Sequence, residues 1–89
     1  MNISDSGSEW ERAAYALARG LGQRDGVWCS IRNILDRTHD TVRSHAREQM
    51  NQILAGHDLG IIGRCTNAYM EGYEKIIRAA KARRAAKAR

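Results

Sequence analysis

The sequence predicts an all-α protein: a compact bundle of about four helices with a basic helical extension at the C-terminal end. Two observations support this class. The 89 residues contain no proline and no phenylalanine, and alanine and arginine are the most frequent residues, which favours short helices over strands. Apolar residues also recur at helical spacing in four segments, which glycine-rich or polar stretches separate.

The chain length allows one domain with an adequate core. We predict a disordered N-terminus over residues 1–7, a helical domain over residues 8–80 and a basic tail over residues 81–89. No stretch is long and apolar enough to span a membrane, and the first residues lack a secretory signal, so a cytoplasmic location is expected. Cys29 and Cys65 are expected to be reduced core residues.

The first helix is predicted to begin at Ser8, which forms a capping-box pattern with Glu11. Its apolar residues follow at helical spacing: Trp10, Ala13, Ala14, Leu17 and Leu21. Gly20 is predicted to end this helix, and the segment GLGQRDG that starts there is predicted to be a flexible connection because it holds three glycines. Trp10 and Trp28 both fall on apolar stripes, so we expect both in the core.

A second helix is predicted at about residues 27–36, where a short apolar stripe follows that connection. The third helix is expected to begin after Thr38, whose hydroxyl can accept a hydrogen bond from a backbone N–H of the first turn. Asp40 is favourably placed against the positive end of the helix dipole. Gly56 is the predicted stop. The predicted inner stripe of the third helix consists of Val42, Ala46, Gln49, Met50 and Ile53.

The fourth helix is predicted from an apolar stripe that keeps a helical period almost to the end of the chain. The residues of this stripe are Ile62, Cys65, Tyr69, Tyr73, Ile76 and Ala80. Because the stripe is longer than a small core needs to cover, we predict a homodimer that forms through this helix. The predicted dimer interface consists of Ile62, Tyr69, Tyr73, Ile76 and Ile77.

Positive charge is concentrated at the C-terminal end. Seven of the fifteen lysines and arginines lie in residues 75–89, which hold none of the ten acids, and the net charge of the chain is +5. Such a segment favours binding to nucleic acid or to an acidic protein surface, although basic termini also serve solubility alone. The predicted phosphate-binding residues of this tail are Arg78, Lys81, Arg83, Arg84, Lys87 and Arg89.

The sequence offers little for catalysis or for metal binding. It contains no recognisable nucleophile motif or pair of catalytic carboxylates, and GLGQRDG lacks the lysine and hydroxyl residue that end a phosphate-binding loop. His39 and His45 are six residues apart and so point to different helix faces, which does not suit a chelating site. We therefore expect neither an enzyme nor a metal site, and no cofactor.

One segment carries a family pattern, formed by Ile31, Leu35, Thr38, Thr41, Val42 and His45. Over residues 27–54 it resembles the helix-turn-helix DNA-binding domain of LuxR/FixJ-type response regulators, although Arg37 stands where that family has an apolar core residue. The resemblance implies a helix-turn-helix-like unit at about residues 27–55, in which Thr38 caps the recognition helix beside a phosphate and Val42 anchors it. The implied DNA-binding residues are Thr38, His39, Thr41, Arg43, Ser44 and Arg47.

Two functions follow from these patterns. The first is a small DNA-binding transcriptional regulator, in which the hairpin specifies the site and the tail adds phosphate contacts. The second is a small helical protein-interaction module, such as an inhibitor, antirepressor or adaptor of the kind that phages encode. Replacement of Arg43 and Arg47 separates them, because it should abolish the first function and matter little to the second. A basic helix also suits RNA.

Overall fold

The chain folds into three helices, as seen in a computed structural model that describes the backbone of residues 3–88 and the side chains of residues 9–88. Helix α1 spans Ile3–Ile31, α2 spans His39–Ile53 and α3 spans Leu59–Lys87. The described residues form no strand, so the prediction of an all-α protein is confirmed, but with three helices in place of four. None of the three is long and apolar enough to cross a membrane.

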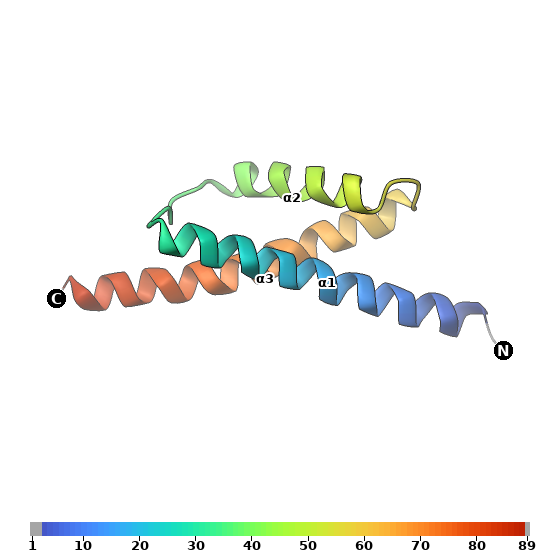
Figure 1. The fold of residues 1–89 in the computed structure, drawn as a ribbon, viewed down its shortest axis with the longest axis horizontal. Coiled ribbons are helices and arrows are strands. Elements are labelled where there is room, and N and C mark those ends of the chain that lie inside the picture. The colour runs from blue at the N-terminus through green and yellow to red at the C-terminus, as the bar shows by residue number, and fades with distance from the viewer. Residues whose placement is uncertain (1–2, 89) are drawn as a thin grey trace.

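Helix α3 is central to the architecture, because it packs along both α1 and α2 while those two hardly touch each other. Figure 1 shows that α1 and α3 run in the same direction and cross, and that α2 lies over them in the opposite direction. The molecule is elongated, with extents of 58 × 23 × 16 Å. At one end, the last turns of α3 extend past the end of α1 (Figure 1).

Helix α1 is longer at both ends than the sequence predicts. It begins at Ile3 rather than at Ser8, so residues 3–7 of the predicted disordered N-terminus are helical; residues 1 and 2 lie outside the described residues. It also continues through GLGQRDG, so the predicted stop at Gly20 and the predicted flexible connection are both wrong. The glycines that suggested a break in the helix instead allow α1 to pack closely against α3.

Glycines allow the backbones of α1 and α3 to touch. A Cβ atom at Gly22 would overlap the carbonyl group of Tyr69, and one at Gly72 would overlap the carbonyl group of Arg19. Both positions therefore require hydrogen in place of a side chain, one on each helix. A Cβ atom at Gly26 would lie 2.8 Å from Ile76 Cβ, which extends the same contact by one turn.

Helix α1 ends in a Schellman-type turn. Asn33 adopts a left-handed conformation with a φ of 58°, and the N–H groups of Asn33 and Ile34 donate to the carbonyl groups of Ser30 and Cys29. Residues 27–31 form the last part of α1, and this turn begins the linker of residues 32–38. The predicted separate helix at residues 27–36 is therefore wrong.

The predictions for the start and end of α2 are confirmed. Thr38 is its N-cap, and the Thr38 hydroxyl accepts a hydrogen bond from the Thr41 N–H at 3.2 Å. Helix α2 stops before Gly56, whose φ of 87° suits the turn that leads into α3. Of the predicted inner stripe, Val42, Ala46 and Met50 are buried, Gln49 is half-buried and Ile53 is exposed.

The core forms mainly between one face of α3 and the other two helices. Both cysteines are buried within it, as predicted. Trp10 and Trp28 are not core residues, since they are 40% and 51% exposed. Trp10 stacks on His57, with ring centroids 4.7 Å apart, and the Arg32 guanidinium lies 4.9 Å from the centroid of the Trp28 ring.

The apolar stripe of α3 contributes to the core and not to a free surface. Of the residues predicted for a dimer interface, Ile62, Tyr69, Tyr73 and Ile77 are buried within the chain itself, and Ile76 is half-buried beside Gly26. The assignment of a dimer interface to these side chains is corrected, because they are covered by α1 and α2 while the three helices remain packed. The first helix was predicted to stop at Gly20, whereas α1 continues to Ile31 and covers this stripe.

Substitution of Gly72 by alanine should lower the free energy of unfolding by about 3 kcal/mol, because the added methyl group forces α1 and α3 apart. Gly63→Ala is the matched control, since Gly63 is also helical but has open space where a Cβ atom would lie. This control should stabilise the protein by up to about 1 kcal/mol through helix propensity. Urea unfolding followed by circular dichroism measures both; equal effects would contradict the close contact.

Candidate nucleic-acid interface

The residues that the family resemblance assigns to DNA binding all lie at the surface, although the Thr38 hydroxyl is occupied by its capping bond and by a 2.8 Å hydrogen bond with the Thr41 hydroxyl. Asp40 and Glu48 are also exposed on α2, so the outer face of this helix is mixed in charge. The exposed members of the predicted set are Thr38, His39, Thr41, Arg43, Ser44 and Arg47.

The predicted helix-turn-helix-like unit is not confirmed. Such motifs join their two helices by a turn of about 3–4 residues, whereas the linker between α1 and α2 extends over residues 32–38. Helix α2 then runs back antiparallel along α3 (Figure 1). The exposed arginines of α2 are therefore presented by a different scaffold from the one that the resemblance implies.

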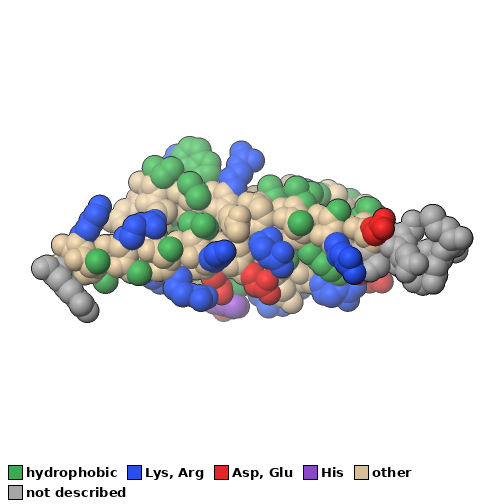
Figure 2. Space-filling view, turned by 90° about the horizontal axis from the view of Figure 1, so that it is seen from below, with side chains coloured by type: hydrophobic (Ala, Val, Ile, Leu, Met, Phe, Trp, Pro, Cys, Tyr) green, Lys and Arg blue, Asp and Glu red, His purple; other side chains and the backbone are tan. Residues whose placement is uncertain are grey.

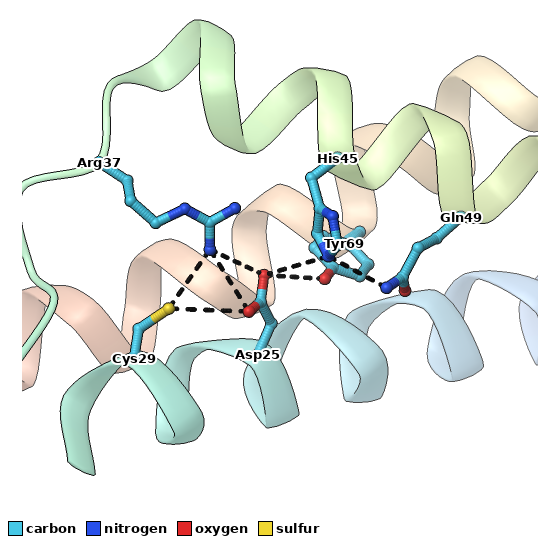
Figure 3. Close-up of polar contacts among 6 residues, drawn as sticks. All are labelled: Asp25, Cys29, Arg37, His45, Gln49 and Tyr69. Carbon is cyan, nitrogen blue, oxygen red and sulfur yellow. Dashed lines mark hydrogen bonds and ion pairs between the residues drawn. The ribbon is translucent and has the colours of Figure 1, made fainter. Parts of the chain in front are cut away.

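A shielded carboxylate on α1 connects all the elements of the fold. Asp25 accepts a hydrogen bond from the Tyr69 hydroxyl of α3 at 2.9 Å and two from Arg37 Nη1 of the linker at 3.3 and 3.4 Å. His45 Nε2 of α2 lies 4.0 Å from the same carboxylate. Figure 3 shows these side chains converging on Asp25. This cluster fixes the linker and α2 relative to the crossing of α1 and α3.

Arg37 is held inward by several contacts. The Asp25 and Arg37 side chains are 17% and 21% exposed, so their ion pair is largely shielded from water. Arg37 Nη1 also lies 3.3 Å from Cys29 Sγ, and the guanidinium lies over the Tyr73 ring at 5.4 Å. Burial opposes the charge, but the Cys29 contact and the Asp25 charge outweigh it and raise the pKa of Arg37 above its usual range.

Sequence reasoning missed this cluster for two reasons. Asp25 fell in the segment predicted to be flexible, and its partners are 12 and 44 residues away along the chain. The available signal was Arg37 itself, which is a charged residue at a position that is apolar in the resembled family. An arginine at such a position needs a nearby acid, and Asp25 supplies it.

A cleft opens between the linker, the first turns of α2 and the middle of α3, with a volume of about 350 Å³. Its lining includes Leu35, Val42, Tyr73 and Ile77, whose side chains are mainly apolar. It also includes three basic residues and a histidine: Arg37, Arg78, Lys81 and His39. Glu74 is the acid in this lining, and it lies 3.8 Å from His39 Nδ1. The cleft therefore brings one predicted DNA-binding residue, His39, to two predicted phosphate-binding residues of α3.

The last turns of α3, residues 78–87, continue from this cleft to the end of the helix, and we call this segment the basic half of α3. Its cations are exposed, and Arg89 lies outside the described residues. Arg84 lies 3.6 Å from Asp36 of the linker in a solvent-exposed ion pair, which contributes little to stability. Figure 2 shows Lys and Arg side chains along this end of the molecule. The five described cations are Arg78, Lys81, Arg83, Arg84 and Lys87.

Two tyrosines of α3 differ in whether the hydroxyl group has a hydrogen-bond partner. The Tyr69 hydroxyl donates to Asp25, and burial together with this bond raises the pKa of Tyr69 well above its usual value. The Tyr73 hydroxyl is buried without a hydrogen-bond partner. Burial and the neighbouring Cys29 thiol raise the pKa of Tyr73 to about 12.

Neither similarity to known proteins nor a cluster of metal ligands in the described part of the chain indicates a function. No family model, curated protein or solved structure matches the chain. Within the described residues, no three His, Cys, Asp or Glu side chains lie together in a way that could hold a metal ion. The candidate interface is therefore defined only by the arrangement of its own side chains.

The two tyrosines allow a matched test of the Asp25 cluster. Tyr69→Phe should lower the free energy of unfolding by about 2 kcal/mol, because it removes a hydrogen bond to a charged acceptor. Tyr73→Phe should leave it unchanged or raise it slightly, because the hydroxyl that it removes has no partner. Chemical unfolding of both variants gives the comparison, and an equal loss in both would contradict the described cluster.

Stability should fall as the pH rises above 10 toward about 12. The unfolded tyrosines ionise near their ordinary value of 10.0, whereas folded Tyr73 keeps its proton until about pH 12. The folded state then binds more protons than the unfolded state, so raising the pH favours unfolding. Urea midpoints measured across this range should decline in the wild type and decline less in Tyr73→Phe; a flat profile would contradict the burial of this hydroxyl.

Proposed function

We propose that this chain is a small DNA-binding protein that acts as a transcriptional regulator by occupying DNA, without catalysing a reaction. One observation carries the proposal. An unbroken series of exposed cations runs from the cleft along the basic half of α3, and within the described residues only Glu74 and Asp36 are acids paired near it. Such a series matches the regularly spaced phosphates of a duplex.

Phosphate contacts supply most of the binding in this proposal. Each phosphate that a lysine or arginine neutralises releases counterions, so the logarithm of affinity falls with the logarithm of salt concentration by about 0.9 per contact. Arg78 and Lys81 lie at the cleft with the largely shielded Arg37, where an anion is partly removed from water and the attraction is stronger. This part of the interface positions the protein on DNA without reading its sequence.

Helix α2 provides the contacts to base edges in this proposal. Arg43, Ser44 and Arg47 are exposed on one helix that no other element covers on its outer side, and the major groove admits a helix of this kind. Asp40 and Glu48 on the same helix weaken its general attraction to phosphates. Sequence preference would therefore come from a few α2 side chains, while the basic half of α3 supplies affinity.

A second candidate function is a protein-interaction module, which the exposed apolar side chains of α1 favour. Leu17, Trp28 and Ile31 are 56%, 51% and 74% exposed, and exposed apolar groups often mark a protein interface. Under this function, the cations of α3 would contact an acidic partner surface. Variants of Arg43 and Arg47 would then leave activity unchanged.

The DNA-binding proposal can be tested by fluorescence anisotropy with a pool of random duplexes at two salt concentrations. Arg78→Gln/Lys81→Gln should lower affinity about tenfold and reduce the salt slope by roughly two, since each side chain accounts for about one phosphate contact. Arg12→Gln/Arg19→Gln is the matched control, because it removes the same charge from exposed positions of α1. Its effect on affinity should be much smaller.

Arg43→Ala/Arg47→Ala should leave binding to random duplexes nearly unchanged but remove the preference for duplexes selected by the wild type. Two results would contradict the proposal: no duplex binding at about 0.15 M salt, or equal losses in the α3 variant and the α1 control. In either case, the protein-interaction function becomes the better account of the surface.

A further inference from the structure

The last turns of α1 and the following turn expose a cluster of large apolar side chains. We call it the Trp28 surface, and it consists of Val27, Trp28, Ile31 and Ile34, which are between 44% and 74% exposed. These side chains follow one another at the surface where α1 ends, and no described element covers them. An exposed apolar cluster of this kind indicates a binding surface.

Basic side chains border the Trp28 surface. Trp28 and Arg24 line a depression of about 270 Å³ between the three helices, which also includes Asp25, the acid paired with Arg37. Trp28 and Arg32 line a second depression of about 270 Å³ with Ile34. Figure 2 shows hydrophobic side chains projecting from one edge of the molecule toward the end where α3 finishes, with Lys and Arg side chains beside them. A partner that fits this surface combines an apolar face with negative charge.

The Trp28 surface adjoins the basic half of α3 through the linker turn. On the other side of that turn, Asn33 and Leu35 line a further depression together with Arg83, Arg84 and Lys87. Ile34, between them in sequence, belongs to the depression of Trp28. A ligand that extends over this turn would therefore contact Trp28 at one end and a row of cations at the other.

The geometry of Trp28 suits a flat, apolar ring. The Arg32 guanidinium lies over the indole at 4.9 Å, so a planar cation and an aromatic ring are presented together at the surface. Aromatic rings and arginine planes are the groups on which proteins stack unpaired nucleobases. Bases within an intact duplex cannot use this surface, because their faces are covered by their neighbours.

We propose that the Trp28 surface binds an unpaired nucleobase of a strand whose phosphates lie along the basic half of α3. This inference rests on the proposed function, since it requires nucleic-acid binding, and it adds a single-stranded segment to the forms of nucleic acid that the protein binds. Trp28 stacks on the base with Arg32 on the other face of the indole, Ile31 and Ile34 contact the sugar beside it, and the cations beyond the linker turn neutralise the adjoining phosphates.

The test compares a thymine homo-oligonucleotide with a blunt duplex of the same length. In a Trp10→Phe background, Trp28 is the sole tryptophan, and its fluorescence should be quenched by the single strand and not by the duplex. Trp28→Ala should weaken single-strand binding about tenfold or more, while duplex affinity changes less than twofold. Trp10→Ala is the control, because Trp10 is similarly exposed but stacks on His57 away from these cations.

The Trp28 variant is expected to fold, because Trp28 lies outside the core. Circular dichroism of each variant checks that the helices are intact. The inference is overturned if Trp28→Ala binds the single strand as tightly as the wild type does, or if the duplex binds and the single strand does not. A blue shift of Trp28 emission with rising protein concentration alone would also overturn it, by showing that a second copy of the chain covers the surface. If neither nucleic acid binds, the proposed function itself fails.

Discussion

The contact of the α1 and α3 backbones at Gly22 and Gly72 is the constraint on which the rest of the structure depends. Each glycine faces a carbonyl group of the other helix, so the two helices approach more closely than side chains would allow. This approach brings Asp25 within 2.9 Å of the Tyr69 hydroxyl. Asp25 then binds Arg37, which turns the linker inward and sets the position from which α2 starts. The cleft beside the basic half of α3 exists because the linker is held in this way.

Local signals in the sequence predicted the elements whose causes are local. The hydroxyl of Thr38, the left-handed turn at Gly56 and the helical period of the α3 stripe each act within a few residues, and each is confirmed. The GLGQRDG segment was misjudged because glycine both ends helices and permits close packing, and only the partner helix decides between the two. Trp10 and Trp28 were misjudged because an apolar helical stripe also fits a surface, and the Asp25–Arg37 pair joins residues too distant in sequence to be paired from spacing alone.

Charge is distributed unevenly over the surface, and this distribution determines which elements bind nucleic acid in the proposed function. The shielded acid Asp25 is neutralised inside the cluster, whereas the cations of α3 beyond Ala80 have no helix packed over them and stay hydrated. Helix α2 mixes arginines with Asp40 and Glu48, so it adds little general attraction. Phosphate contacts by the basic half of α3 are therefore expected to set affinity, and the few contacts made by α2 and Trp28 are expected to set preference. The predicted DNA-binding and phosphate-binding residues that the structure describes are all exposed, but the scaffold that presents them differs from a helix-turn-helix.

The most direct measurement is a nuclear magnetic resonance titration of the isotope-labelled full chain with a short DNA duplex at about 0.15 M salt. The account predicts that the largest amide shifts fall in two segments that meet at the cleft, residues 37–47 and residues 74–88, while the first turns of α1 remain unchanged. Shifts confined to α1, or the absence of shifts in α3, would contradict the account and direct the search to a protein that binds the exposed face of α1.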